Sequence, residues 1–199
     1  MKIRKTLLLL VLAVVFSIVL AACGNSSPST ESSSAAGEEP GTAETNTNGG
    51  NILIAYFSHT GNTEEVAGQI ADLTGGTLAE IQRAEEYGDL QEEAEAEILE
   101  GVHPEITVSV DNVEDYDTIF VGYPIWWDEA PAMIATFLAE NDFSGKTIIP
   151  FCTSASDDID NSLHIFSELC PDAEIAEGLT ANDLNDIEPW IQELGNLLT

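Results

Sequence analysis

The residues between positions 58 and 63 are of the types that bind a phosphate group. The segment reads Ser-His-Thr-Gly-Asn-Thr and directly follows the apolar run Ile-Leu-Ile-Ala-Tyr-Phe. A buried parallel strand reads as such an unbroken run, and a helix-like pattern follows the loop. Free N–H groups and the positive end of the helix dipole meet where a helix begins. The sequence therefore predicts a phosphate site, and the alternative is a polar helix cap, which needs only one such residue.

A monoester phosphate fits this loop better than a triphosphate. The loop has neither the lysine of a triphosphate-binding loop nor a Gly-x-Gly-x-x-Gly pattern. The hydroxyls of Ser58, Thr60 and Thr63, together with nearby N–H groups, can satisfy a monoester dianion without a counter-charge. Gly61 lets the backbone approach closely. We interpret His59 as an exposed loop residue rather than a ligand.

Two further loops have unusual compositions. Residues 122–128 read Gly-Tyr-Pro-Ile-Trp-Trp-Asp, and a planar ligand stacked on the adjacent indoles would cover their apolar surface. The alternative is core packing of at least one indole, because neighbouring side chains in an extended segment point in opposite directions. Residues 153–158 carry hydroxyls and N–H groups that suit the polar edge of a planar ring. We expect Asp157 and Asp158 to cap the helix that follows.

The pattern of the chain brings these loops together. Strands are expected at residues 52–57, 77–82, 118–122, 146–152 and 174–179, and helices at 62–73, 89–99, 130–141, 159–169 and 186–198. Alternating elements of this kind predict an α/β fold, a doubly wound five-stranded parallel sheet covered on both faces. With the strand order 2-1-3-4-5, ligands bind at the carboxyl ends of the strands, between the first and third.

The ordered set Ser-x-Thr-Gly-Asn-Thr, Gly-Tyr-Pro-Ile-Trp-Trp and Cys-Thr-Ser resembles the flavodoxin family over essentially all of residues 51–199. That family binds flavin mononucleotide (FMN) and transfers electrons. The resemblance implies a set of FMN contacts: Ser58, Thr60, Gly61, Asn62 and Thr63 for the phosphate, Pro124, Ile125, Trp126 and Trp127 for the isoalloxazine ring, and Thr153, Ser154 and Ala155 for its other edge. The chain departs from the family at Ala155, Asp157 and Asp158, where related proteins often have glycines.

The first fifty residues have the pattern of an exported lipoprotein. Three of the five basic residues lie in the first five positions, an apolar stretch covers residues 7–20, and Leu-Ala-Ala-Cys follows. We expect a signal peptide at 1–22, and the resemblance of this segment to a lipobox implies a lipidated Cys23. The alternative is an uncleaved membrane helix, although the run is short for a span. Residues 23–50 read as a flexible tether and 51–199 as one domain.

The charge balance excludes several classes of partner. The whole chain carries 36 acidic residues, and cleavage before Cys23 leaves only Arg83 and Lys146 as basic side chains. Such a surface argues against nucleic acid and against direct adsorption to anionic lipid. An exported protein can pair cysteines, but Cys152 and Cys170 fall at distant places in the predicted fold, so we expect two unpaired, mostly buried thiols.

These observations lead to one hypothesis and its alternatives. We expect an FMN protein anchored by lipid to the extracytoplasmic face of a bacterial membrane, which passes electrons to a redox partner protein or reduces a small acceptor. The sequence does not separate a carrier from an enzyme, and no catalytic or metal-ligating set is expected. A solute-binding lipoprotein and a flavodoxin-like scaffold without cofactor are the alternatives. The acidic run at 92–100 is interpreted as a solvated face, or as a docking surface for a basic partner.

Overall fold

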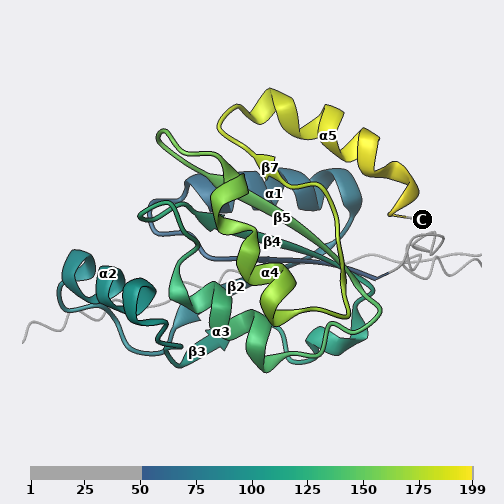
Figure 1. Cartoon of the computed structure of the whole chain (residues 1–199). Coiled ribbons are helices and arrows are strands. Elements are labelled where there is room, and N and C mark those ends of the chain that lie inside the picture. The colour runs from purple at the N-terminus through teal and green to yellow at the C-terminus, as the bar shows by residue number, and fades with distance from the viewer. Residues whose placement is uncertain (1–50, 199) are drawn as a thin grey trace, which may run out of the picture. The chain divides into compact units, whose positions relative to one another are not determined.

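The structure, a computed structural model, describes residues 51–198 as an α/β fold in which strands and helices alternate as predicted (Figure 1). The strands are β1 (Ile52–Tyr56), β2 (Thr77–Arg83), β3 (Ile106–Val108), β4 (Thr118–Pro124), β5 (Thr147–Thr153), β6 (Glu174–Ile175) and β7 (Leu179–Thr180). The helices are α1 (Asn62–Thr74), α2 (Leu90–Glu100), α3 (Ala132–Glu140), α4 (His164–Leu169) and α5 (Ile187–Glu193).

One sheet runs through this part of the chain in the order β3-β2-β1-β4-β5-β6, with β7 also paired to β5. The pairings of β1 with β2 and β4, and of β4 with β5, are parallel. The predicted order of five parallel strands is therefore confirmed. The crevice expected between the first and third predicted strands lies at the carboxyl ends of β1 and β4.

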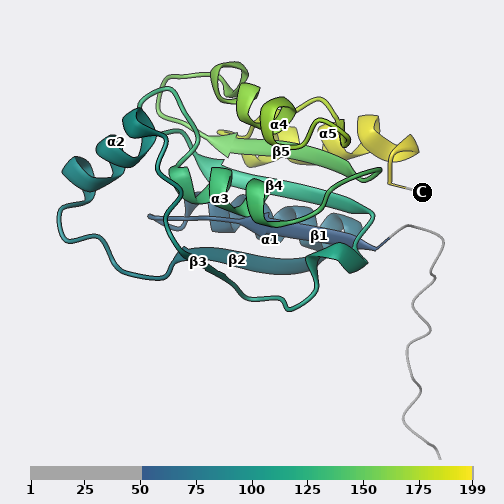
Figure 2. The same cartoon turned by 60° about the horizontal axis from the view of Figure 1, so that its bottom comes forward.

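Both faces of the sheet are covered by helices (Figures 1 and 2). Helices α1 and α5 lie on one face, and α3 and α4 on the other. Alternate residues of β1 enter the two resulting cores: Leu53 and Ala55 pack towards α3 and α4, whereas Ile54 and Tyr56 pack towards α1 and α5. Because both faces are buried, the strand has to be apolar throughout, which is why its sequence shows no alternation.

The sheet departs from the prediction at its two edges. The antiparallel edge strand β3 was not predicted, since three residues give too short a pattern to recognise. The single strand predicted at 174–179 is in fact two short strands, β6 and β7. Pro150 of β5 lies between the two paired stretches, and its lack of an N–H group interrupts the ladder there.

The helix predicted at 159–169 is also divided, into the 3-10 helix η2 (Ile159–Ser162) and α4. The Ser162 hydroxyl donates to the Ile159 carbonyl at 2.8 Å, and this local bond competes with regular α-helical pairing.

The two basic side chains of the described residues are used to hold the fold together. Arg83 Nε lies 3.0 Å from Glu97 Oε1, and its guanidinium stacks 4.6 Å from the centre of the Tyr87 ring. The Tyr87 hydroxyl donates to the other Glu97 oxygen at 2.8 Å, so α2 is attached to β2 through one buried carboxylate. Lys146 Nζ donates to the carbonyls of Glu114 and Tyr116 at 2.7 Å each.

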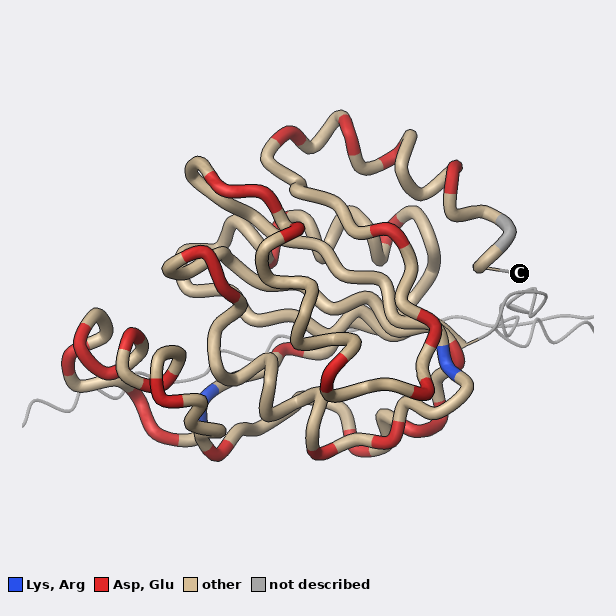
Figure 3. Tube along the Cα trace, viewed as in Figure 1, with Lys and Arg blue, Asp and Glu red and all other residues tan. Residues whose placement is uncertain are grey.

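Acidic residues are spread along the helices and loops of residues 51–198 rather than gathered in one segment (Figure 3). Among these residues, none of the helices combines the length and the apolar character that crossing a membrane requires. The predicted signal peptide, Cys23 and the tether lie outside the described residues.

Cys152 and Cys170 are unpaired and buried, as predicted. Burial raises the pKa of the Cys152 thiol to about 12 and that of Cys170 to about 11, because the interior disfavours the thiolate. Both side chains therefore act as small apolar groups of the core rather than as nucleophiles.

The first prediction concerns Gly122, where β4 passes the Phe151 ring. A Cβ atom at position 122 would overlap that ring, whose neighbours leave it little room to move. We expect Gly122→Ala to lower the free energy of unfolding by about 2 kcal/mol or more, measured by urea denaturation. The control is Gly68→Ala on α1, where a Cβ meets nothing within 4 Å, and it should be neutral or stabilising by up to about 1 kcal/mol. Equal effects of the two changes would contradict this account of the packing.

The second prediction concerns alkaline pH. Below the ordinary thiol pKa of 9.0 the two cysteines are protonated in both the folded and the unfolded chain, so they leave stability unchanged. Above it the unfolded chain releases protons that the folded chain retains, and the free energy of unfolding falls with rising pH by up to about 1.4 kcal/mol per thiol and pH unit. In urea titrations above this value, Cys152→Ala should show a shallower fall than the parent. An unchanged slope would mean that Cys152 ionises normally in the fold.

Candidate functional site

The three loops singled out by composition lie together at the carboxyl ends of β1, β4 and β5. Backbone bonds connect them in sequence: Phe57 N–H donates to Gly122 O, and Ile125 N–H donates to Thr153 O, each at 2.9 Å. The hydroxyls of Thr63 and Thr153 are 2.9 Å apart and join the first loop to the third. The loops are thus fixed relative to one another, as the predicted topology requires.

A cavity of about 610 Å³ opens between these loops. Eight of its lining residues come from the three loops and the first turn of α1. From the first loop and α1 they are Thr60, Asn62 and Glu65, and from the second and third loops they are Pro124, Ile125, Thr153, Ser154 and Ala155. Val66 lines it too, together with Ala181, Asn182 and Leu184 from the segment after β7. None of these described lining residues is lysine or arginine, so an anion bound here is held by neutral donors.

The first turn of α1 supplies those donors. Gly61 is the N-cap residue and has φ 89°, a left-handed conformation that glycine adopts without strain. The first intrahelical bond runs from Glu65 N–H to Gly61 O at 3.0 Å, so the N–H groups of Asn62, Thr63 and Glu64 precede the helical ladder. No side chain caps the helix at Gly61. These N–H groups are therefore free to bind an anion where α1 begins, and Asn62 among them lines the cavity.

The three hydroxyls of the first loop have different surroundings. Ser58 Oγ accepts the Gly61 N–H at 3.1 Å and holds the turn in shape. Thr63 is buried and bonds to Thr153, as described above. Thr60 is exposed and lines the cavity with Asn62. The structure therefore places Thr60 and Asn62 where they can contact a ligand, and Ser58, Gly61 and Thr63 where they shape the loop.

The residues of the second loop have different surroundings before and after Ile125. Pro124 and Ile125 line the cavity, whereas Trp126 and Trp127 do not. Trp126 packs edge-on against Phe57 at 5.3 Å between ring centres and is partly buried against the core, as one of the two alternatives predicted. The exposed fraction of Trp127 is 41 %, and it faces a separate hollow.

The third loop is supported by the segment after β7. Ser154 N–H donates to Asn182 Oδ1 at 2.9 Å, and Ser154 Oγ accepts the Asp157 N–H at 2.8 Å. The predicted capping role of Asp157 and Asp158 is wrong. Asp158 precedes η2 without a capping bond because its carboxylate accepts the Thr180 hydroxyl at 2.9 Å, while Asp157 accepts from Ser156 at 3.2 Å.

Several lining residues were not predicted. Asn182 and its neighbours follow the last strand of the sheet, so the rule that ligands bind at the carboxyl ends of strands would have pointed to them. Glu65 lies on the first turn of α1 and lines the cavity. Its residue type gives no signal for phosphate binding, so only its place on the helix could have pointed to it. Within residues 51–198, no three His, Cys, Asp or Glu side chains are grouped so that they could hold a metal ion.

Comparisons with known proteins bear on the family and the fold. Residues 51–194 match a family model described as flavodoxin. A search of curated proteins gave no match.

Solved structures of bacterial proteins are similar to this chain. A provisionally assigned flavoprotein from Bacteroides eggerthii is 34% identical, with a TM-score of 0.67 over 73% of this chain and 98% of its own. A similarly assigned protein from Bacteroides uniformis is 33% identical, with a TM-score of 0.62 over 72% and 99%. A flavoprotein from Lactobacillus acidophilus, solved in complex with FMN, is 24% identical, with a TM-score of 0.58 over 71% and 98%, and shows the shared fold.

Proposed function

Because residues 51–194 match its family model, the chain belongs to the flavodoxin family, and we propose that it binds FMN in the cavity at the carboxyl ends of β1, β4 and β5. The observation that carries the proposal is the uncapped first turn of α1, which opens into this cavity. The volume of the cavity, about 610 Å³, lies in the usual range for cofactor sites. The similar flavoprotein from Lactobacillus acidophilus was solved in complex with FMN.

The residues present fit a phosphate monoester at one end of the cavity and a planar ring at the other. The N–H groups of Asn62, Thr63 and Glu64 and the Thr60 hydroxyl would hold the phosphate without a cation. Glu65 lines the same cavity, so its carboxylate works against the anion and limits its affinity.

The ring would lie between the second and third loops. Pro124 and Ile125 offer an apolar wall, and the backbone and hydroxyl groups of residues 153–155 offer polar contacts to the ring edge. Trp126 packs on Phe57 and does not line the cavity. Direct contact of the ring with Trp126 or Trp127 stays a prediction.

Bound FMN supplies electron-transfer chemistry, and the protein sets access to it and its potential. The side chains described here would orient the cofactor through the loops: Ser58 and Thr63 fix the first loop, and Asn182 fixes the third. Asp157 and Asp158 lie in the third loop without lining the cavity, and a carboxylate close to bound flavin would disfavour a negative charge on the ring and lower its potential. We propose electron transfer to a redox partner protein or to a small acceptor as the function.

We also propose that the protein acts outside the cytoplasmic membrane, held there by lipid on Cys23. The support is the order of basic residues, apolar stretch and Leu-Ala-Ala-Cys in the first 23 positions. Acyl chains rather than the acidic surface would supply the membrane affinity.

The third prediction is that the purified protein binds one FMN. Adding FMN should give the absorbance bands of a bound oxidised flavin and quench tryptophan fluorescence, and calorimetry should give one site per chain. A protein that leaves the spectrum of added FMN and its own fluorescence unchanged would contradict the proposal and favour a scaffold without cofactor.

Three variants test the phosphate assignment by the same titration. Thr60→Ala should weaken FMN binding by about fivefold to tenfold, because it removes one hydrogen bond to a charged group. Glu65→Gln should strengthen binding by about twofold to fivefold, because it removes a nearby negative charge. Thr77→Ala, at the opposite end of β2 from the cavity, is the control and should leave the affinity unchanged. If Thr60→Ala and Glu65→Gln both match the control, the phosphate lies elsewhere.

The fourth prediction concerns the anchor. Cys23→Ser should move the protein from the membrane fraction to the soluble fraction of its bacterial host and abolish labelling by a radioactive fatty acid. The matched control, Cys152→Ser, changes a cysteine buried in the fold and should leave labelling in place. Labelling that survives Cys23→Ser would contradict lipidation at this residue.

A further inference from the structure

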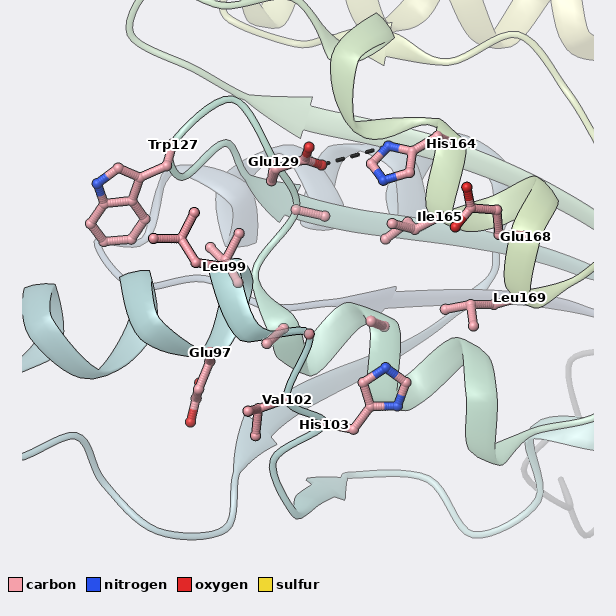
Figure 4. A pocket seen from close by; sticks show the side chains of 15 residues that line it. Glu97, Leu99, Val102, His103, Trp127, Glu129, His164, Ile165, Glu168 and Leu169 are labelled. Carbon is pink, nitrogen blue, oxygen red and sulfur yellow. Dashed lines mark ion pairs between the residues drawn. The ribbon is translucent and has the colours of Figure 1, made fainter.

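A second cavity, of about 480 Å³, lies between the C-terminal end of α2, α3, α4 and the turn at residues 126–129 (Figure 4). It shares none of its lining residues with the proposed FMN cavity. The loop after β4 borders both: Pro124 and Ile125 line the first, whereas Trp127, Glu129 and Ala130 line the second.

One wall of this cavity is apolar and open to solvent. The exposed fraction of Leu99 is 76 %, and Val102 and Trp127 are each 41 % exposed. Figure 4 shows Trp127 on the same side of the hollow as Leu99, with His164 and Ile165 opposite. Several large apolar side chains gathered around one hollow are typical of a binding site rather than of ordinary surface.

The backbone at Trp127 is strained. Trp127 has φ 49° and Asp128 has φ 63°, so two consecutive non-glycine residues adopt the left-handed conformation. The turn is closed by paired backbone bonds of 2.9 Å between Trp126 and Glu129. This geometry is that of a type I′ turn, which normally takes Asn-Gly. Strained backbone of this kind is concentrated at functional sites. Here the left-handed conformation directs the Trp127 indole towards the second cavity.

The polar side of the cavity favours a positive charge. Glu129 and Glu168 lie on its lining, and none of the described residues there is lysine or arginine. His164 Nδ1 lies 3.6 Å from Glu129 Oε2 and 3.1 Å from the Asn161 carbonyl oxygen. Glu168 has no ion pair among the described residues. Glu97 also belongs to the lining, but its carboxylate points away from the hollow and is bonded to Arg83 and Tyr87 (Figure 4).

We propose that the second cavity binds a small organic cation, an aromatic or alkyl ammonium compound. The apolar wall, which includes the Trp127 indole, covers the body of the ligand, and Glu129 and Glu168 balance the charge of its head on the opposite side. The acidic surface of the protein raises the local concentration of such cations. This site goes beyond FMN binding, because nothing in it depends on the cofactor.

The test is calorimetric titration of the purified full-length protein with three probes of one shape: naphthylmethylammonium, the neutral naphthylmethanol and the anionic naphthoate. The cation should bind at one site per chain, at least about tenfold more tightly than the alcohol, and the anion should show no saturable binding. Equal binding of cation and alcohol would overturn the ligand class, and no saturable binding of any probe would overturn the site.

Variants locate the binding. Glu168→Gln should weaken the cation about fivefold and leave the alcohol unchanged, whereas Glu193→Gln, an exposed acid on α5, should change neither. Leu99→Ser should weaken both probes, and Leu73→Ser, a leucine of α1 that is 42 % exposed, should weaken neither. If Glu168→Gln behaves as Glu193→Gln does, the assignment is wrong.

The titration is run with and without FMN so that this proposal is judged apart from the cofactor. The cation should bind in both cases. Binding of FMN without binding of the cation would overturn the second site alone, and the reverse result would overturn only the cofactor proposal.

Discussion

Hydrogen bonding of a phosphate by backbone N–H groups, without a cationic side chain, is the interaction on which the proposed site depends. Arg83 and Lys146 are both committed to carbonyl or carboxylate oxygens of the fold, and neither lines the cavity. The remaining charge of the described surface is acidic and repels an anion at long range. Affinity must therefore come from short, directional bonds at the start of α1, which act only if the loop geometry is fixed.

That geometry is fixed by hydrogen bonds within and between the loops. The Ser58 hydroxyl sets the turn that leads into Gly61, and the bond between buried Thr63 and half-buried Thr153 ties the start of α1 to the end of β5. Asn182 then holds the third loop through Ser154. Two of the three hydroxyl groups in the first loop therefore hold the loop in shape. The abundance of hydroxyls, from which a phosphate site was predicted, is thus explained in part by loop structure.

The sequence predicted the sheet and the position of the site because these depend on strong local signals. The buried run before Ser58 and the glycines after α1 are strong local signals, and the alternation of elements indicates a parallel sheet, for which the order 2-1-3-4-5 was adopted. Features that depend on distant contacts were missed. The break at Pro150 needs knowledge of its partner strand, the Asp158 carboxylate meets Thr180 from another loop, and no local pattern shows that Trp127 faces away from Pro124.

The turn at residues 126–129 explains why adjacent tryptophans have different environments. In an extended segment they would point to opposite faces of one layer, but a type I′ turn begins at Trp126 and bends the chain back to Glu129. Two left-handed residues there cost about 1–2 kcal/mol each, and a glycine after Trp127 would remove part of this cost. The packing of Trp126 on Phe57 and the paired bonds to Glu129 offset the strain. The loop thereby presents one face to each cavity, and a rigid partition of this kind would keep a ligand in the second cavity at a constant position relative to the first.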